Sequence, residues 1–96
     1  MLEVRQTSIY SAWFDAIRDR QAKVRIDIRI RRLSLGNAGD GKPVGEGVSE
    51  LRVNFGPGYR VYFVQRREEC IILLAGGDKT SLSDDICQAK VLASNL

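Results

Sequence analysis

The chain of 96 residues contains 15 Lys and Arg, 12 Asp and Glu and no His, which gives a formal net charge of +3. Its composition, 44% hydrophobic and 28% charged, is typical of one folded domain over 1–96 and argues against disorder. The lack of histidine and the two lone cysteines argue against a zinc site, and we expect no metal and no cofactor. The longest apolar run, 70–75, is too short to span a membrane, and the N-terminus lacks the apolar core of a secretory signal. We therefore expect a cytoplasmic protein in which Cys70 is a buried, reduced thiol.

The first part of the chain predicts a short strand followed by a helix. Residues 2–6 are compatible with a strand, and Ser8 is a suitable N-cap for a helix over 9–19. In that helix, large apolar residues recur every four positions and share one face: Ile9, Trp13 and Ile17.

The segment 23–36, KVRIDIRIRRLSLG, supports two interpretations. Every second residue from 24 to 30 is Val or Ile, an alternation typical of a strand. As a helix it would have Gly36 as a C-terminal cap, an apolar stripe and a neighbouring stripe of arginines. The apolar stripe is Ala22, Ile26, Ile30 and Leu33, and the arginines are Arg18, Arg25, Arg29 and Arg32. The pattern alone leaves both interpretations open.

The second half predicts an antiparallel meander. A glycine-rich segment, 36–47, is expected to be one long loop before it. The last of the predicted strands lacks polar alternation, so we expect it to be central and covered on both faces. Ser81 or Ser83 is expected to cap a final helix. The three strands are predicted at 48–55, 59–66 and 70–75.

Alternation along the meander sorts its side chains between two faces. One face is apolar and should meet the core: Leu51, Val53, Phe55, Tyr59, Val61 and Phe63. The other, which we expect to be more open, carries Glu50, Arg52, Asn54, Arg60 and Tyr62, and Lys79 could reach its edge. Arginines on one solvated face are common. Two guanidinium groups with an ammonium and a phenol nevertheless suit phosphates and stacked bases, so this face is a candidate nucleic-acid surface.

The ordered series GVSELR (47–52), GPGYRVYF (56–63) and GGDK (76–79), followed by a short helix, resembles the RelE/ParE superfamily of type II toxins. The nearest likeness is to HigB-like addiction-module killer proteins, and it covers nearly the whole chain. The resemblance implies an α+β fold with an N-terminal strand, two antiparallel helices, a three-stranded antiparallel meander and a short C-terminal helix. It therefore implies that 23–36 is helical. It also implies a partner, a helix-turn-helix antitoxin. We expect no association with membranes, because the longest apolar run is short.

Many relatives cut mRNA on the ribosome, so the resemblance implies a ribosome-dependent endoribonuclease that arrests translation. By this likeness Arg60 stabilises the charged transition state, Arg52 holds a neighbouring phosphate, and Lys79 acts as acid or base. The alternative is a ParE-like, non-enzymatic inhibitor of DNA gyrase, and a third interpretation is a nucleic-acid-binding module without toxicity.

The chain departs from the nuclease pattern near its C-terminus. Relatives often carry His or Tyr there, and residues 80–96 contain neither. Tyr62 is a candidate stacking or proton-carrying group, and Glu50 or Asp78 a candidate base, although Asp78 suits a capping role equally well. Asn54, Arg29 and Arg32 are further candidate RNA contacts. The arginine stripe is otherwise a solvated helix face or a contact for an acidic antitoxin.

Overall fold

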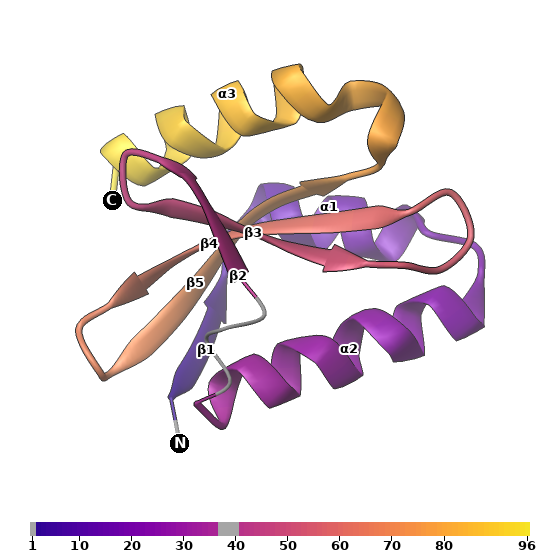
Figure 1. Ribbon diagram of the computed structural model, residues 1–96, viewed down its shortest axis with the longest axis horizontal. Helices are drawn as coiled ribbons and strands as arrows, with labels where there is room; N and C mark the ends of the chain where they lie inside the picture. Colours follow the sequence, from indigo (N-terminus) through magenta and orange to yellow (C-terminus); the bar gives the residue numbers. More distant parts are fainter. Residues whose placement is uncertain (1, 37–40) are drawn as a thin grey trace.

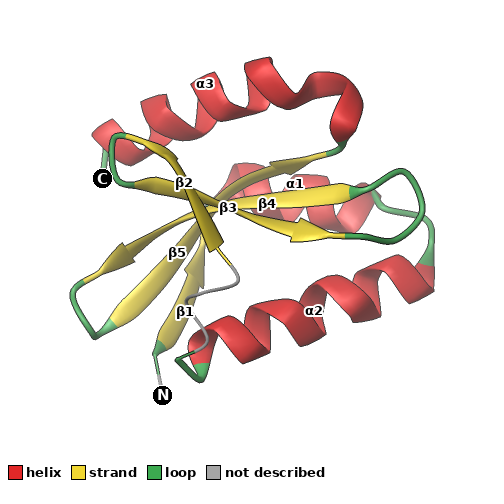
Figure 2. Ribbon diagram, in the orientation of Figure 1, coloured by secondary structure: helices red, strands yellow, loops and turns green. Residues whose placement is uncertain are grey.

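The computed structural model describes residues 2–36 and 41–96 and places helices on both faces of a five-stranded sheet (Figure 1). Helices α1 and α2 lie on one face and α3 on the other (Figure 2). The elements are β1 (Glu3–Gln6), α1 (Ser8–Ala16), α2 (Arg20–Ser34), β2 (Gly41–Gly45), β3 (Val48–Val53), β4 (Tyr59–Arg66), β5 (Cys70–Gly77), the 3₁₀ turn η2 (Lys79–Ser81) and α3 (Leu82–Ser94).

The strand order is β1-β5-β4-β3-β2. Strands β2 to β5 form an antiparallel meander, and β1 adds to β5 in parallel. The predicted α+β fold is confirmed, with one more strand in the meander than expected.

That extra strand corrects the prediction of one long loop over 36–47. Residues 41–45 pair with β3, with a register shift between Pro43 and Gly45, and a tight turn follows. The turn uses left-handed backbone at Gly45, Glu46 and Gly47, with φ of 109°, 55° and 79°. Glycine adopts this conformation at little cost, which explains the two glycines in the turn. Residues 37–40 of the predicted loop lie outside the described residues.

Helix α1 begins and ends earlier than predicted. Its N-cap is Thr7 and not Ser8, because the Thr7 hydroxyl accepts a hydrogen bond from the Tyr10 amide at 3.1 Å. The same hydroxyl donates to the Leu74 carbonyl of β5 at 2.7 Å, which ties the helix start to the sheet. The predicted apolar face is confirmed at Trp13 and Ile17, which are partly buried against the core. It is wrong at Ile9, which is 37% exposed, and Tyr10 is the buried residue of the helix.

The segment 23–36 lies in α2 and the turn that follows it, as the resemblance implied. Asp19 caps the helix by accepting from the Gln21 and Ala22 amides, and Gly36 has the left-handed φ of 103° expected just after a helix. The predicted apolar stripe is buried at Ala22, Ile26, Ile30 and Leu33. The strand-like alternation failed because its members point to opposite sides of the helix, and Val24 and Ile28 are exposed.

Both faces of the meander are covered, which corrects the expectation of one open face. Under α1 and α2 lies an apolar cluster that includes the predicted core residues Leu51, Val53, Val61 and Phe63. On the other face α3 covers a second cluster: Val48, Tyr62, Val64, Leu74, Ala75 and Ala89. Strand β5 contributes to both clusters, as expected for a doubly covered strand, although β4 is the middle strand of the five. Cys70 is buried and unpaired, as predicted.

Candidate functional site

Glu50 is the centre of a charged cluster on the α3 face of the sheet. It lies on β3 and is only 4% exposed. Its Oε1 accepts a hydrogen bond from Nε of Arg52 at 2.7 Å, and its Oε2 lies 3.8 Å from Nε of Arg60 on β4. One buried carboxylate therefore interacts with two guanidinium groups.

Arg52 and Arg60 lie directly opposite each other on neighbouring antiparallel strands. Two cations in this position repel, so the carboxylate of Glu50 offsets a cost that the strand pairing imposes. The two arginines differ in access, because 47% of the Arg52 side chain is exposed and only 11% of the Arg60 side chain. Nε of Arg60 is buried and makes no hydrogen bond within the described part of the chain.

Tyr62 continues this face of β4, opposite Glu50, but it is fully buried. Its hydroxyl has no hydrogen-bond partner among the residues that the structure describes. Burial, and next the negative charges of Glu50 and Asp85, raise the pKa of Tyr62 to about 12. The expectation that Tyr62 lies on an open face is wrong, and in this arrangement its ring is not accessible to a base.

The first turn of α3 packs over the sheet next to the charged cluster. Gly77 of β5 pairs with Arg60, and a Cβ built on Gly77 would overlap Oδ2 of Asp85. The carboxylate of Asp85 therefore lies against Gly77, the strand partner of Arg60, and it accepts a hydrogen bond from the Ser81 hydroxyl. Ser81 precedes α3 as predicted, but its side chain makes no backbone cap.

Lys79 lies at the edge of the cluster. Its side chain is exposed and passes over the turn before β4, since a Cβ on Gly58 would lie 2.7 Å from its Cε. The neighbouring Asp78 has the capping role, because its Oδ1 accepts from the amide and hydroxyl of Thr80 at 2.9 and 2.6 Å. The side-chain and backbone hydrogen bonds from Thr80 lower the pKa of Asp78.

The remaining predicted contacts lie on the other side of the sheet. Asn54 follows the end of β3 and, with Arg29 and Arg32 of α2, lines a pocket of about 260 Å³. The structure therefore divides the predicted site in two: Arg52, Arg60 and Lys79 belong to the α3 side, and these three belong to the α2 side. Sequence reasoning missed Asp85. The sequence feature that could have identified it is the acidic pair Asp84 and Asp85 in the first turn of the last helix, shortly after two glycines.

The chemistry that the cluster offers is that of cations beside a buried carboxylate. Arg52 and Lys79 are exposed cations, and the carboxylate of Glu50 accepts a hydrogen bond from Arg52. Within residues 2–36 and 41–96, no three Cys, Asp or Glu side chains are grouped as metal ligands. None of the helices described is long and apolar enough to cross a membrane.

The arrangement of helices and strands is that of a RelE-like fold. One chain of the E. coli RelBE toxin-antitoxin complex superposes with a TM-score of 0.69 at 6% identity, over 81% of this chain and 96% of that chain. The solution structure of HP0894 from Helicobacter pylori, a conserved hypothetical protein, matches with a TM-score of 0.57 at 14% identity, over 85% and 99%. At these identities the likeness establishes the fold.

A relative by sequence is found in Haemophilus influenzae (strain ATCC 51907 / DSM 11121 / KW20 / Rd). This uncharacterized protein is 42% identical over 95 residues, which cover 99% of this chain and 96% of the relative. The chain belongs to the same family as this H. influenzae protein. No family model matches the sequence.

Proposed function

We propose that the protein is the toxin of a type II toxin-antitoxin system, of the HigB-like kind, and that it cuts mRNA on the ribosome. The observation that carries the proposal is the pair of arginines, Arg52 and Arg60, side by side on the sheet of a RelE-like fold, with Lys79 at their edge. The partner would be a helix-turn-helix antitoxin that blocks this activity. The structural neighbour RelBE is a toxin-antitoxin complex, and this supports an antitoxin partner.

In this proposal RNA first meets the accessible cations. A phosphate that binds the guanidinium of Arg52 breaks the hydrogen bond between Arg52 and Glu50. The freed carboxylate of Glu50 then accepts the proton of the 2′-hydroxyl. The 2′-oxygen attacks phosphorus, Arg60 stabilises the added negative charge, and Lys79 protonates the departing 5′-oxygen. The products are a 2′,3′-cyclic phosphate and a 5′-hydroxyl, so protons and bonds balance.

Mapping transcript ends after brief induction tests the proposal. We expect cuts inside translated codons with the original chain, and a loss of at least about 100-fold with Arg60→Ala. Arg66→Ala is the matched control, because Arg66 is an exposed arginine at the far end of the same strand. A folded Arg60→Ala protein that still cuts would refute the role of Arg60.

The low exposure of the Arg60 side chain, 11%, favours a second candidate, a ParE-like inhibitor of DNA gyrase without nuclease activity. A cation held by a buried carboxylate is equally consistent with a structural ion pair. This candidate predicts intact transcripts and a DNA-damage response upon induction, so the same experiment separates the two.

A further inference from the structure

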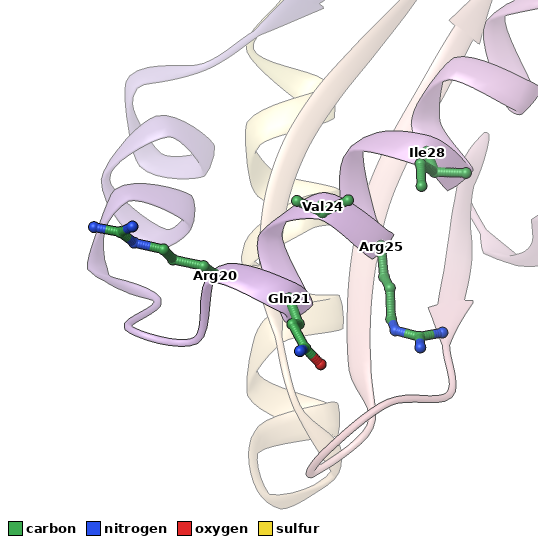
Figure 3. Close-up of a pocket in the computed structure, with 5 residues that line it drawn as sticks. All are labelled: Arg20, Gln21, Val24, Arg25 and Ile28. Carbon is green, nitrogen blue, oxygen red and sulfur yellow. The ribbon is translucent and has the colours of Figure 1, made fainter.

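The outer side of α2 carries two apolar side chains that no described element covers. Val24 is 56% exposed and Ile28 is 52% exposed, and they lie one helical turn apart. They line a shallow pocket of about 470 Å³ together with Arg20, Gln21 and Arg25 (Figure 3). The pocket of about 260 Å³ beside β3 shares Arg25 and Ile28 with it, so the two form one continuous surface, the α2 groove.

The α2 groove combines this apolar floor with a single sign of charge. Among the residues that the structure describes, no acidic side chain lines the groove, and four arginines do: Arg20, Arg25, Arg29 and Arg32. The Arg25 guanidinium lies 4.4 Å from the centre of the Phe55 ring, so the ring is already covered by a cation.

We propose that the α2 groove is a docking site for an acidic amphipathic helix of a protein partner. Apolar side chains on one face of a second helix would pack against Val24 and Ile28, and acidic residues beside that face would meet the arginines. The proposal deepens the antitoxin part of the proposed function, and it does not depend on the nuclease part.

The floor of the groove argues against RNA as its occupant. Val24 and Ile28 are aliphatic and offer no ring for base stacking, while the ring of Phe55 is covered by Arg25. A second copy of this chain is also disfavoured, because the same face on both partners would place arginines against arginines.

A binding experiment with the folded chain tests this directly. The probe is a peptide of about 18 residues with leucines on one helical face and glutamates beside them, and its control has the same composition in scrambled order. Titration into ¹⁵N-labelled protein should give saturable amide shifts at Val24 and Ile28, with a Kd of roughly 10–100 µM. No saturable shifts up to about 1 mM, or equal binding of the scrambled peptide, would overturn the proposal.

Two substitutions sharpen the test. Val24→Gln with Ile28→Gln should weaken peptide binding at least about tenfold, since both anchors lose apolar contact. Val91→Gln on α3 is the matched control, because Val91 is 59% exposed on another helix, and it should leave binding unchanged. Equal loss in both variants would overturn the placement of the site on α2.

The competing occupants are further arms of the same experiment. A single-stranded RNA oligonucleotide that shifts the groove amides at lower concentration than the peptide would overturn the proposal, and so would a dimer in sedimentation that Ile28→Gln dissociates. Transcript cutting that depends on Arg60, together with no peptide binding, would overturn this proposal alone. Peptide binding without transcript cutting would support it and refute only the nuclease.

Discussion

The two faces of the sheet are both buried but are built differently. The face under α1 and α2 is an apolar cluster that, among the described residues, has ten buried members, from Tyr10 to Leu73. The face under α3 is apolar at one end, whereas its other end holds the carboxylate of Glu50 between two arginines. A buried ion pair stabilises a fold less than apolar packing of the same volume usually does. A charged cluster kept in such a place is the pattern expected of a functional site.

Two adjacent glycines give the most direct test of this difference, because they face opposite sides of the sheet. A Cβ on Gly76 would overlap the indole ring of Trp13, within the apolar face, while a Cβ on Gly77 meets the end of the Asp85 side chain. We expect Gly76→Ala to lower the free energy of unfolding by about 3 kcal/mol and Gly77→Ala by about 1 kcal/mol. An indole held by Tyr10 and Tyr59 has little room to move, whereas a carboxylate can rotate away.

Urea denaturation of both variants measures the two values. Gly47→Ala would be a poor control because Gly47 has a φ of 79°, which strains any other residue. Val91→Ala, at an exposed helical position, is preferable and should change little. If Gly77→Ala proved the more damaging variant, the α3 face would be the more rigidly packed of the two.

The next effect concerns Glu50. Glu50→Ala should lower the free energy of unfolding by about 2 kcal/mol, because it leaves two facing arginines without their shared carboxylate. The value is below that for a fully buried pair, since half of the Arg52 side chain is in solvent. Glu50→Gln keeps the volume and should cost less, and Glu68→Ala, at an exposed turn, is the control. Glu50→Ala as stable as the original chain would mean that the cluster makes no net contribution to the fold.

The sequence predicted β1, β3, β4 and β5, but neither β2 nor the burial of the second face of the sheet. Alternation placed Leu51 and Val61 on the core side, and the apolar stripe from Ala22 to Leu33 was identified, because both depend on local periodicity. Periodicity could not decide between strand and helix for 23–36, because the segment contains both an every-second-residue alternation and an apolar stripe at helical spacing. The family resemblance was needed to choose the helix.

What periodicity could not supply was the position of α3. Whether Arg60 and Tyr62 face solvent or a helix depends on where a later segment packs, and that is a tertiary effect. The missed strand β2 has the same origin, because a segment rich in glycine and proline becomes a strand only through its pairing with β3. Alternation therefore predicted that Arg52 and Arg60 are neighbours on one face of the sheet, but it did not predict the burial of that face.

The smallest expected effect is at Tyr62, whose buried hydroxyl has no partner in the described part of the chain. Tyr62→Phe removes an unsatisfied polar group, so at pH 7 the free energy of unfolding should stay unchanged or rise by up to about 1 kcal/mol. The effect of pH is sharper. The pKa of Tyr62 is raised to about 12 in the folded chain, whereas an ordinary tyrosine in the unfolded chain ionises near pH 10. The stability associated with the neutral phenol is therefore fully present below about pH 10, and it is lost as the pH rises toward 12.

Denaturation curves of the original chain and Tyr62→Phe at several values between pH 9 and pH 12 would show this as a difference that widens with pH. The free energy of unfolding should fall more steeply with pH in the original chain, because only the original chain has a phenol at position 62 that is ionised in the unfolded state and neutral in the folded state. Equal slopes would mean that the hydroxyl reaches water and that α3 does not seal this end of the sheet. In that case the difference between the two faces would be smaller than the structure indicates.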